Sequence, residues 1–219
     1  MTTSERTIAA LASYPMPSTD IVNRVNWQVE PQRAALLIHD MQYYFLKKYD
    51  MTAAPIPELV QHTQAIYAAC KAAGIPVYYT AQPKVQSAAD RALLNDFWGS
   101  GVTAPNFQAE QPIIEELQPA EDDTVLTKWR YSAFVRSSLA EQLRAAQRDQ
   151  LIITGIYAHI GCMTTALDAF MQDIQPFFIT DATADFSAEE HQMAIRHVSQ
   201  RCGVCLTTQQ LLSALSKVD

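Results

Sequence analysis

Polar residues follow several short apolar runs of the chain, at the points where those runs end. A carboxylate and an amine that meet in one pocket can act as a proton donor or base with an electrostatic partner. Asp40 is the carboxylate after the first run, and Lys128 is the amine after the third. Further candidates are Gln82, after the second run, and Tyr157 and Gly161, after the fourth.

Each candidate also has a purely structural interpretation. Asp40 can cap a helix that follows it, and a single lysine such as Lys128 is more often a solvated loop residue. His39 and His159 flank the proposed site, but single histidines are more often structural. Cys162 is either a nucleophile or a small buried thiol at a helix start. Arg91 and the aromatic residues are equally open to a packing or surface role: Tyr43, Phe45, Trp98, Tyr131 and Phe134.

The elements that must position these residues alternate about six times between strand and helix. Ala34–His39 is a continuous apolar run, which is typical of a strand buried on both faces. The spacing of apolar residues from Leu59 to Cys70 predicts a helix, with Gly74 as its cap. The other predicted strands are Val77–Thr80, Val125–Thr127, Leu151–Thr154, Phe177–Thr180 and Val204–Thr207. The other predicted helices are Arg6–Ser13, Ala88–Phe97, Pro112–Leu117, Ser137–Ala146, Cys162–Asp173, Ala188–Gln200 and Gln209–Lys217.

This alternation predicts an α/β fold with three layers: a six-stranded parallel sheet with helices on both faces. Ligands bind at the carboxyl ends of the strands in such sheets, which is where the candidate residues lie. The 219 residues suit one domain over 33–219, preceded by an N-terminal arm over 1–32 that carries three prolines.

Composition excludes several classes of function. The net charge of -7 argues against nucleic-acid and anionic-membrane partners. No leader pattern or long apolar span is present, and the four cysteines suit reduced thiols, so we expect a cytoplasmic protein. Cys202-x-x-Cys205 has no second cysteine pair, so we predict no metal site there.

Four segments resemble the isochorismatase family: residues 34–45 (AALLIHDMQYYF), 79–84 (YTAQPK), 127–134 (TKWRYSAF) and 155–187, which begins GIYAHIGCMTTALDAF. The resemblance extends from about Ser18 to Leu212. It implies a Rossmann-like sheet and hydrolysis of the enolpyruvyl ether of isochorismate, giving pyruvate and 2,3-dihydro-2,3-dihydroxybenzoate.

The resemblance also implies roles for the candidate residues. Related cysteine hydrolases use an Asp–Lys–Cys triad, whose positions here hold Asp40, Lys128 and Gly161. The glycine removes the nucleophile and is expected to leave room for substrate. The segment Tyr79–Val85 lacks the histidines that bind metal in nicotinamidases, so we expect neither metal nor cofactor.

Asp40 is then the expected general acid, and it must be protonated when substrate binds. Burial against Phe45 and a dianionic substrate would raise its pKa, whereas Lys128 would lower it. The resemblance assigns polar and anionic groups of the substrate to Gln82, Arg91 and Lys128, with help from Tyr157 and the backbone N–H of Gly161. Phe45, Trp98 and Tyr131 would form the walls of the ring pocket.

Three alternatives stay open. The same chemistry on 2-amino-2-deoxyisochorismate would serve phenazine rather than siderophore synthesis. A cysteine-dependent amidohydrolase would use Cys162, and a non-catalytic scaffold would serve an assembly line. The chain ends soon after the last predicted helix, so a stand-alone enzyme without a carrier-protein domain is expected. The resemblance also implies a homodimer or larger homo-oligomer.

Overall fold

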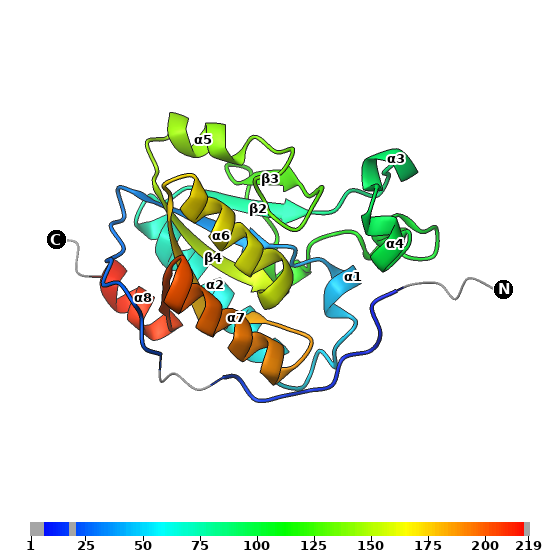
Figure 1. The fold of residues 1–219 in the computed structure, drawn as a ribbon, viewed down its shortest axis with the longest axis horizontal. Coiled ribbons are helices and arrows are strands. Elements are labelled where there is room, and N and C mark those ends of the chain that lie inside the picture. The colour runs from blue at the N-terminus through cyan, green and yellow to red at the C-terminus, as the bar shows by residue number, and fades with distance from the viewer. Residues whose placement is uncertain (1–6, 18–20, 217–219) are drawn as a thin grey trace.

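The computed structural model describes residues 7–17 and 21–216, and these form one six-stranded sheet whose neighbouring strands are all parallel. The strand order is β3-β2-β1-β4-β5-β6, as Figure 1 allows the reader to follow. The predicted fold class is thereby confirmed. The strands are β1 (Ala34–His39), β2 (Val77–Ala81), β3 (Thr124–Thr127), β4 (Gln150–Ile156), β5 (Gln175–Ala184) and β6 (Val204–Leu206).

Helices cover both faces of this sheet. On one face α2 (Ile56–Ala72) and α8 (Thr208–Leu215) pack together. On the other face lie α5 (Leu139–Ala145), α6 (Met163–Met171) and α7 (Ala188–Arg201), and Figure 1 shows α6 and α7 in front of the strands. The smaller helices are α1 (Tyr43–Leu46), α3 (Ala88–Arg91) and α4 (Leu94–Trp98). No described helix is long and apolar enough to cross a membrane.

The central strand β1 shows why its sequence is continuously apolar. All six of its residues are fully buried. Leu36 and Ile38 belong to the core under α2 and α8, whereas Ala35 and Leu37 belong to the core under α5, α6 and α7. Alternate side chains of a strand point to opposite faces, so a strand between two helical layers needs apolar residues at every position.

The N-terminal arm differs from its prediction. Residues 7–13 hold no helix, although the sequence predicts one over Arg6–Ser13; Arg6 itself lies outside the described residues. The arm hydrogen-bonds to the loop beyond α1: Leu11 N–H donates to the Lys48 carbonyl (2.7 Å), and Tyr14 N–H donates to the Ala54 carbonyl (3.1 Å). Bonds to another segment replace the internal bonds that a helix would have made.

The predicted helix Ala88–Phe97 is divided into α3 and α4. The break falls at Ala92, whose φ of 47° is in the left-handed region and ends the first helix. The predicted helix Pro112–Leu117 is shortened to a 3₁₀ turn over Glu115–Leu117. Both differences lie in the long connection from β2 to β3, where helical spacing is short and tertiary contacts decide the path.

The segment between β4 and α6 has a regular structure of its own. Residues Ala158–Cys162 form a π-helical turn, and α6 begins directly after it. The Tyr157 carbonyl accepts hydrogen bonds from the backbone N–H groups of Ile160 (3.2 Å), Gly161 (3.1 Å) and Cys162 (3.2 Å). This short stretch therefore has a fixed backbone at the carboxyl edge of the sheet.

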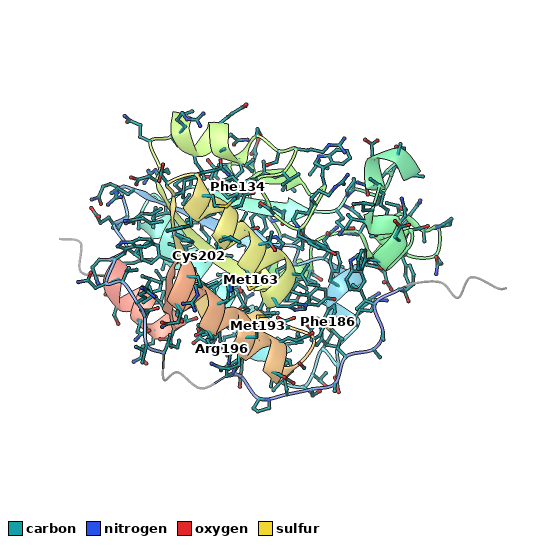
Figure 2. The ribbon with its side chains drawn as sticks, in the orientation of Figure 1. Phe134, Met163, Phe186, Met193, Arg196 and Cys202 are labelled. Atoms are coloured by element: carbon teal, nitrogen blue, oxygen red, sulfur yellow. The ribbon has the colours of Figure 1, made fainter. Side chains whose placement is uncertain are left out.

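The four cysteines are buried and free. Cys202 lies at the end of α7, where Figure 2 labels it, and Cys205 follows on β6. Both belong to the core between the sheet and its helices, so the pattern Cys202-x-x-Cys205 serves packing here.

Candidate active site

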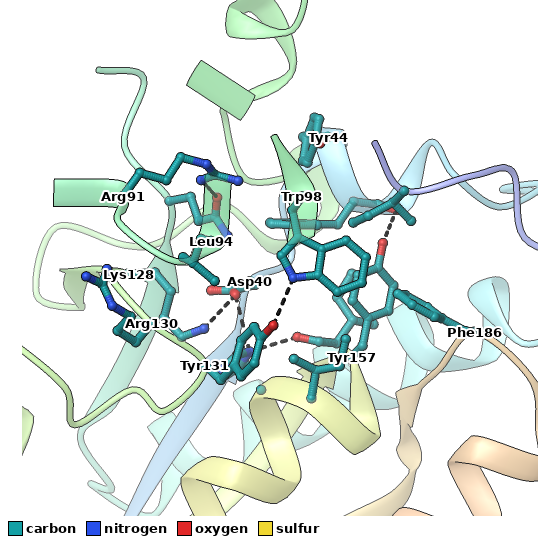
Figure 3. A pocket seen from close by; sticks show the side chains of 17 residues that line it. Asp40, Tyr44, Arg91, Leu94, Trp98, Lys128, Arg130, Tyr131, Tyr157 and Phe186 are labelled. Carbon is teal, nitrogen blue, oxygen red and sulfur yellow. Dashed lines mark hydrogen bonds and ion pairs between the residues drawn. The ribbon is translucent and has the colours of Figure 1, made fainter. Parts of the chain in front are cut away.

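A pocket lies at the carboxyl ends of β1, β2, β3 and β4, and Figure 3 shows it from close by. The candidates Tyr43, Phe134, His159 and Cys162 are not among the lining residues of this pocket, whereas the residues that the resemblance assigned to the catalytic and substrate-binding roles all line it. They are Asp40, Phe45, Gln82, Arg91, Trp98, Lys128, Tyr131, Tyr157 and Gly161. The parallel topology explains this convergence, because strands far apart in sequence end at one edge.

The Asp40 carboxylate lies at the floor of the pocket and is held by two side chains. Lys128 Nζ donates to its Oδ2 at 2.9 Å, and Thr80 Oγ1 donates to its Oδ1 at 2.5 Å. Asp40 directly follows β1 and has a φ of 50°, a conformation that non-glycine residues rarely adopt. Such a backbone is found mainly where the surroundings fix it for a function.

The net electrostatic effect on Asp40 is set by its neighbours. Burial raises the pKa of this carboxyl, but Lys128, His39 and the Thr80 hydroxyl outweigh burial, and the pKa lies below its usual value. Asp40 is therefore a carboxylate paired with Lys128 before substrate binds. Of the opposing effects that the sequence left open, those that lower the pKa, led by the charge of Lys128, together outweigh burial in the unliganded protein.

Arg91 provides a second positive charge in the pocket. Its side chain is 3% exposed, and Nε donates to the Gly99 carbonyl at 2.5 Å. Its Nη1 lies 3.4 Å from the amide oxygens of both Gln82 and Gln86. These neutral acceptors orient the guanidinium without neutralising it. A guanidinium of this kind has the geometry to bond a carboxylate in a bidentate manner.

Gln82 is fixed through its backbone. Its carbonyl accepts from Gln42 Nε2 at 3.0 Å, and its N–H donates to Gln42 Oε1 at 2.8 Å. This pairing leaves the Gln82 side chain facing the pocket beside Arg91. Gln42 is itself fully buried between these segments.

Aromatic side chains form the walls. Tyr157 packs edge-to-face against Phe45 and Phe186, and its hydroxyl donates to the Phe45 carbonyl at 3.1 Å. Trp98 Nε1 donates to the Tyr131 hydroxyl at 2.9 Å. Figure 3 shows this bond joining α4 to the segment after β3 across the pocket.

Gly161 differs from its expected role in two ways. Its N–H donates to the Tyr157 carbonyl within the π-helical turn, so it is engaged there. The space beside its Cα is occupied by the His39 ring, because a Cβ at this position would overlap that ring. The missing side chain therefore makes room for His39 rather than for substrate.

Cys162 has no place in the pocket chemistry. It is fully buried in the core under α5, α6 and α7. Burial raises the pKa of this thiol well above its usual value, which suppresses the thiolate that a nucleophile requires. These observations argue against the amidohydrolase alternative.

A second cluster of titratable groups lies beside the pocket. Possible ligand atoms of His159, Asp185 and Glu190 lie within 4.8 Å of one another, and these residue types can bind a metal ion. The Asp185 carboxylate already accepts from the backbone N–H groups of His159 (2.6 Å) and Phe186 (2.8 Å). Its oxygens thus have partners within the protein.

Several pocket residues escaped the sequence reasoning. Phe186 lines the pocket just beyond β5, and Thr80 holds Asp40 from the end of β2, so a search of every strand end would have found both. His39 was named but given a structural role. Ile8, Tyr44, Leu94 and Arg130 also line the pocket, and nothing in their spacing points to it.

The chain is similar to known proteins both in sequence and in structure. The family model described as the isochorismatase domain matches residues 34–210. The chain is 52% identical over 209 residues to enterobactin synthase component B of Escherichia coli (strain K12), covering 94% of this chain and 73% of that protein. It is 51% identical over 210 residues to an isochorismatase of Bacillus subtilis, covering 95% and 67%.

A third relative and a solved structure complete the comparison. Phenazine biosynthesis protein PhzD1 of Pseudomonas aeruginosa is 43% identical over 212 residues, covering 94% of this chain and 98% of that protein. A crystal structure of a cysteine hydrolase from Pseudomonas syringae has a TM-score of 0.75 at 23% identity, covering 91% and 99%. The last likeness concerns the fold alone.

Proposed function

The chain belongs to the isochorismatase family, and from this premise we propose that it hydrolyses isochorismate to pyruvate and 2,3-dihydro-2,3-dihydroxybenzoate. The single observation that carries the proposal is the buried pair of Asp40 and Lys128, at 2.9 Å, in a pocket where Gly161 takes the position of the nucleophile of related cysteine hydrolases. Relatives named isochorismatase and enterobactin synthase component B support the same substrate.

The reaction is hydrolysis of a vinyl ether. Protonated Asp40 transfers its proton to the terminal methylene carbon of the enolpyruvyl group, which forms an oxocarbenium ion. The resulting carboxylate of Asp40 stabilises that cation. Water adds to the cationic carbon and loses a proton, which returns to the Asp40 carboxylate, and the hemiketal collapses to release pyruvate. No covalent intermediate with the protein is formed, which agrees with a glycine at position 161.

The pocket also suits a substrate with two carboxylates. Arg91 is a buried cation held by neutral oxygens, and Lys128 is 5% exposed beside Asp40. A dianion that draws on Lys128 weakens its hold on Asp40 and raises the pKa of that carboxyl. Binding of the substrate thereby supplies the protonated acid that the unliganded pocket lacks.

A second candidate substrate is 2-amino-2-deoxyisochorismate. The observation that favours it is the 43% identity to phenazine biosynthesis protein PhzD1, a relative that this chain matches over 98% of its length. The two substrates differ by a hydroxyl or an amine on the ring. The enolpyruvyl ether is common to both, so Asp40 would perform the same step.

The test measures pyruvate release from each substrate by the wild-type protein and by Asp40→Ala. We expect the wild type to act on isochorismate with the larger kcat/KM, and Asp40→Ala to bind substrate without releasing pyruvate. A preference for the amino substrate would select the second candidate. Turnover that survives in Asp40→Ala would refute the assignment of the general acid. A wild type inert toward both substrates would favour the scaffold alternative.

We further propose that the protein is cytoplasmic, with an arm over 1–32, one domain over 33–219, and a homodimeric or larger assembly. The four buried, free thiols suit a reducing compartment.

Exposed apolar side chains between α4 and α6 offer a surface for a second copy: Phe97 is 69% exposed and Met171 is 70% exposed. Light scattering coupled to size-exclusion chromatography measures the number of copies in the assembly, and a monomer would refute the proposed homo-oligomer.

A further inference from the structure

The His39 ring fills the volume that a side chain at position 161 would need. A Cβ built on Gly161 would overlap Cε1 of the ring and would lie 2.8 Å from Nε2 and 3.0 Å from Nδ1. Contacts this short force one group to move, because protein interiors are close-packed. The φ angle of Gly161 lies outside the left-handed region. The ring, rather than the backbone conformation, therefore requires glycine.

The ring itself has little freedom to yield. His39 pairs with Thr80 on β2 and with Gly155 on β4, and its side chain is fully buried. Gly155 has a φ of 105°, and a Cβ there would lie 2.7 Å from the backbone nitrogen of His39. Two glycines thus enclose one residue, Gly155 against its backbone and Gly161 against its ring.

Hydrogen bonding fixes the orientation of the ring. Nδ1 lies 2.7 Å from the Ile156 carbonyl, and since a carbonyl only accepts, Nδ1 carries the proton. Nδ1 is also 3.6 Å from Asp40 Oδ2. Nε2 is buried without a hydrogen-bond partner in the part of the chain that the structure describes. Burial and Lys128 lower the pKa of His39 to about 4, against smaller effects of Asp40 and the Ile156 and Tyr131 carbonyls. The ring is therefore neutral at pH 7.

We propose that His39 is the positioning residue for Asp40, and that it acts from the space left by the absent side chain at position 161. The kinetic part of this inference rests on the proposed function, whereas the steric part does not. His39 and Gly161 then form one unit: a larger residue at 161 displaces the ring, and the ring carries the adjoining Asp40 with it. Asp40 is sensitive to such a shift because its left-handed backbone and its two donors fix one placement.

A double-mutant cycle tests this unit. Gly161→Ala is made in the wild type and in His39→Asn, whose shorter side chain keeps an N–H donor for the Ile156 carbonyl. In the wild-type background we expect kcat for pyruvate release to fall roughly a hundredfold, the scale of a 1 Å misplacement. In the His39→Asn background we expect the same substitution to cost less than about fivefold, because the volume is now free.

Gly203→Ala is the matched control. A Cβ on Gly203 would lie 2.7 Å from the Pro176 carbonyl oxygen, and the atoms it would meet belong to Pro176 and Val198. Its cost should be equal in both backgrounds. Equal costs for Gly161→Ala in both backgrounds would overturn the proposal. Failure of Gly161→Ala to fold in the His39→Asn background would also overturn it, since the need for glycine would not come from the ring.

Two further measurements, kcat and the pH–rate profile, distinguish a positioning role of His39 from a role in packing alone. His39→Asn should keep kcat within about tenfold of the wild type, whereas His39→Ala should lose roughly a hundredfold at similar KM. The limb of the pH–rate profile on which activity falls as the pH rises reports loss of the proton from Asp40, and it should move in His39→Ala and stay in His39→Asn. Identical rates and identical profiles for the two variants would overturn the positioning role.

The steric claim can be read without turnover. The same cycle measured by urea unfolding should show that Gly161→Ala destabilises the wild type and spares His39→Asn. Loss of this coupling would refute the inference even if isochorismate is hydrolysed. A protein inert toward isochorismate but coupled in unfolding would refute the proposed function and leave the steric inference standing.

Discussion

Two buried aspartates at the same edge of the sheet show how one residue type is put to two uses. Asp40 follows β1 and Asp185 follows β5, and each lies beside a histidine. Asp40 is held by the side chains of Lys128 and Thr80 and lines the pocket. Asp185 is fully buried and accepts from two backbone N–H groups and from His159 Nδ1 at 2.5 Å.

The difference lies in what each carboxylate holds. Backbone donors cannot leave Asp185 without unfolding the π-helical turn and the loop after β5, so its role is to fix them. The donors to Asp40 are side-chain groups that a ligand can compete for. The partner histidines differ as well: burial and Lys128 lower the pKa of His39, whereas the hydrogen bond and charge of Asp185 raise the pKa of His159.

The largest expected effect is on turnover. Asp40→Asn removes the proton that the vinyl ether must receive, so we expect kcat for pyruvate release to fall by about 10²–10⁴-fold. Asp185→Asn keeps an acceptor for one backbone N–H, and we expect a loss below about tenfold. Steady-state assays of both variants decide the comparison. Similar losses in the two would show that Asp185 takes part in the chemistry.

The second effect is on stability. Asp185→Ala leaves two backbone donors and the His159 ring without their acceptor. At about 1–3 kcal/mol for each unsatisfied buried donor, we expect the free energy of unfolding to fall by about 3 kcal/mol or more. Urea titration measures it, with the exposed Glu141→Ala as a control that should change it by less than about 0.5 kcal/mol. If Asp185→Ala lowers the free energy of unfolding no more than Glu141→Ala does, Asp185 has no structural role.

The third effect is on pH dependence, and its sign follows from the histidines. Burial lowers the pKa of His39 and of His191 to about 4 in the folded protein. The unfolded chain binds these protons near pH 6.5, so the stability due to the neutral rings is present above pH 6.5 and is lost as the pH falls toward 4. Each ring contributes a slope of up to about 1.4 kcal/mol per pH unit. Urea titrations across this range measure how the free energy of unfolding changes with pH. His39→Asn should remove the contribution of one ring from this slope. An unchanged slope would show that the His39 ring is not held neutral in the folded protein.

The smallest effect has the opposite sign. Burial lowers the pKa of His159, but the hydrogen bond and charge of Asp185 outweigh it, so the pKa is raised. Stability from this pair is therefore full below about pH 6.5 and is lost as the pH rises through the folded pKa. NMR titration of the imidazole should show a pKa above 6.5 that falls in Asp185→Asn. If His159 titrates at the same pH in the wild type and in Asp185→Asn, then Asp185 does not raise the pKa of His159, and the contrast with His39 fails.

The sequence predicted the frame of the fold because its strands are continuous apolar runs. Ala34–His39 was placed to the residue, and residues after strand ends, such as Asp40 and Lys128, were found by topology. Arg91 came from family resemblance, since a lone arginine on a helix is usually exposed. The split at Ala92 and the path of residues 7–13 depend on distant partners, which local spacing does not encode.

The place of His39 could not be predicted for a related reason. Its ring lies against Gly161, which is more than a hundred residues away in sequence, and single histidines in strands are mostly structural. The direction of the Asp40 pKa was left open by the sequence, because the contact with Lys128 that lowers this pKa depends on a distance that sequence does not give.

The hydrogen bond between Trp98 and Tyr131 gives the protein an optical reporter of its own. Of its three tryptophans, Trp98 lines the pocket, and its indole nitrogen is tied to the opposite wall. A ligand that enters between these walls changes the polarity around the indole and the partner of its N–H. Quenching or shifting of the emission of Trp98 therefore follows occupancy in real time, and Trp98→Phe removes the signal. Binding and release become measurable in stopped flow without a labelled substrate.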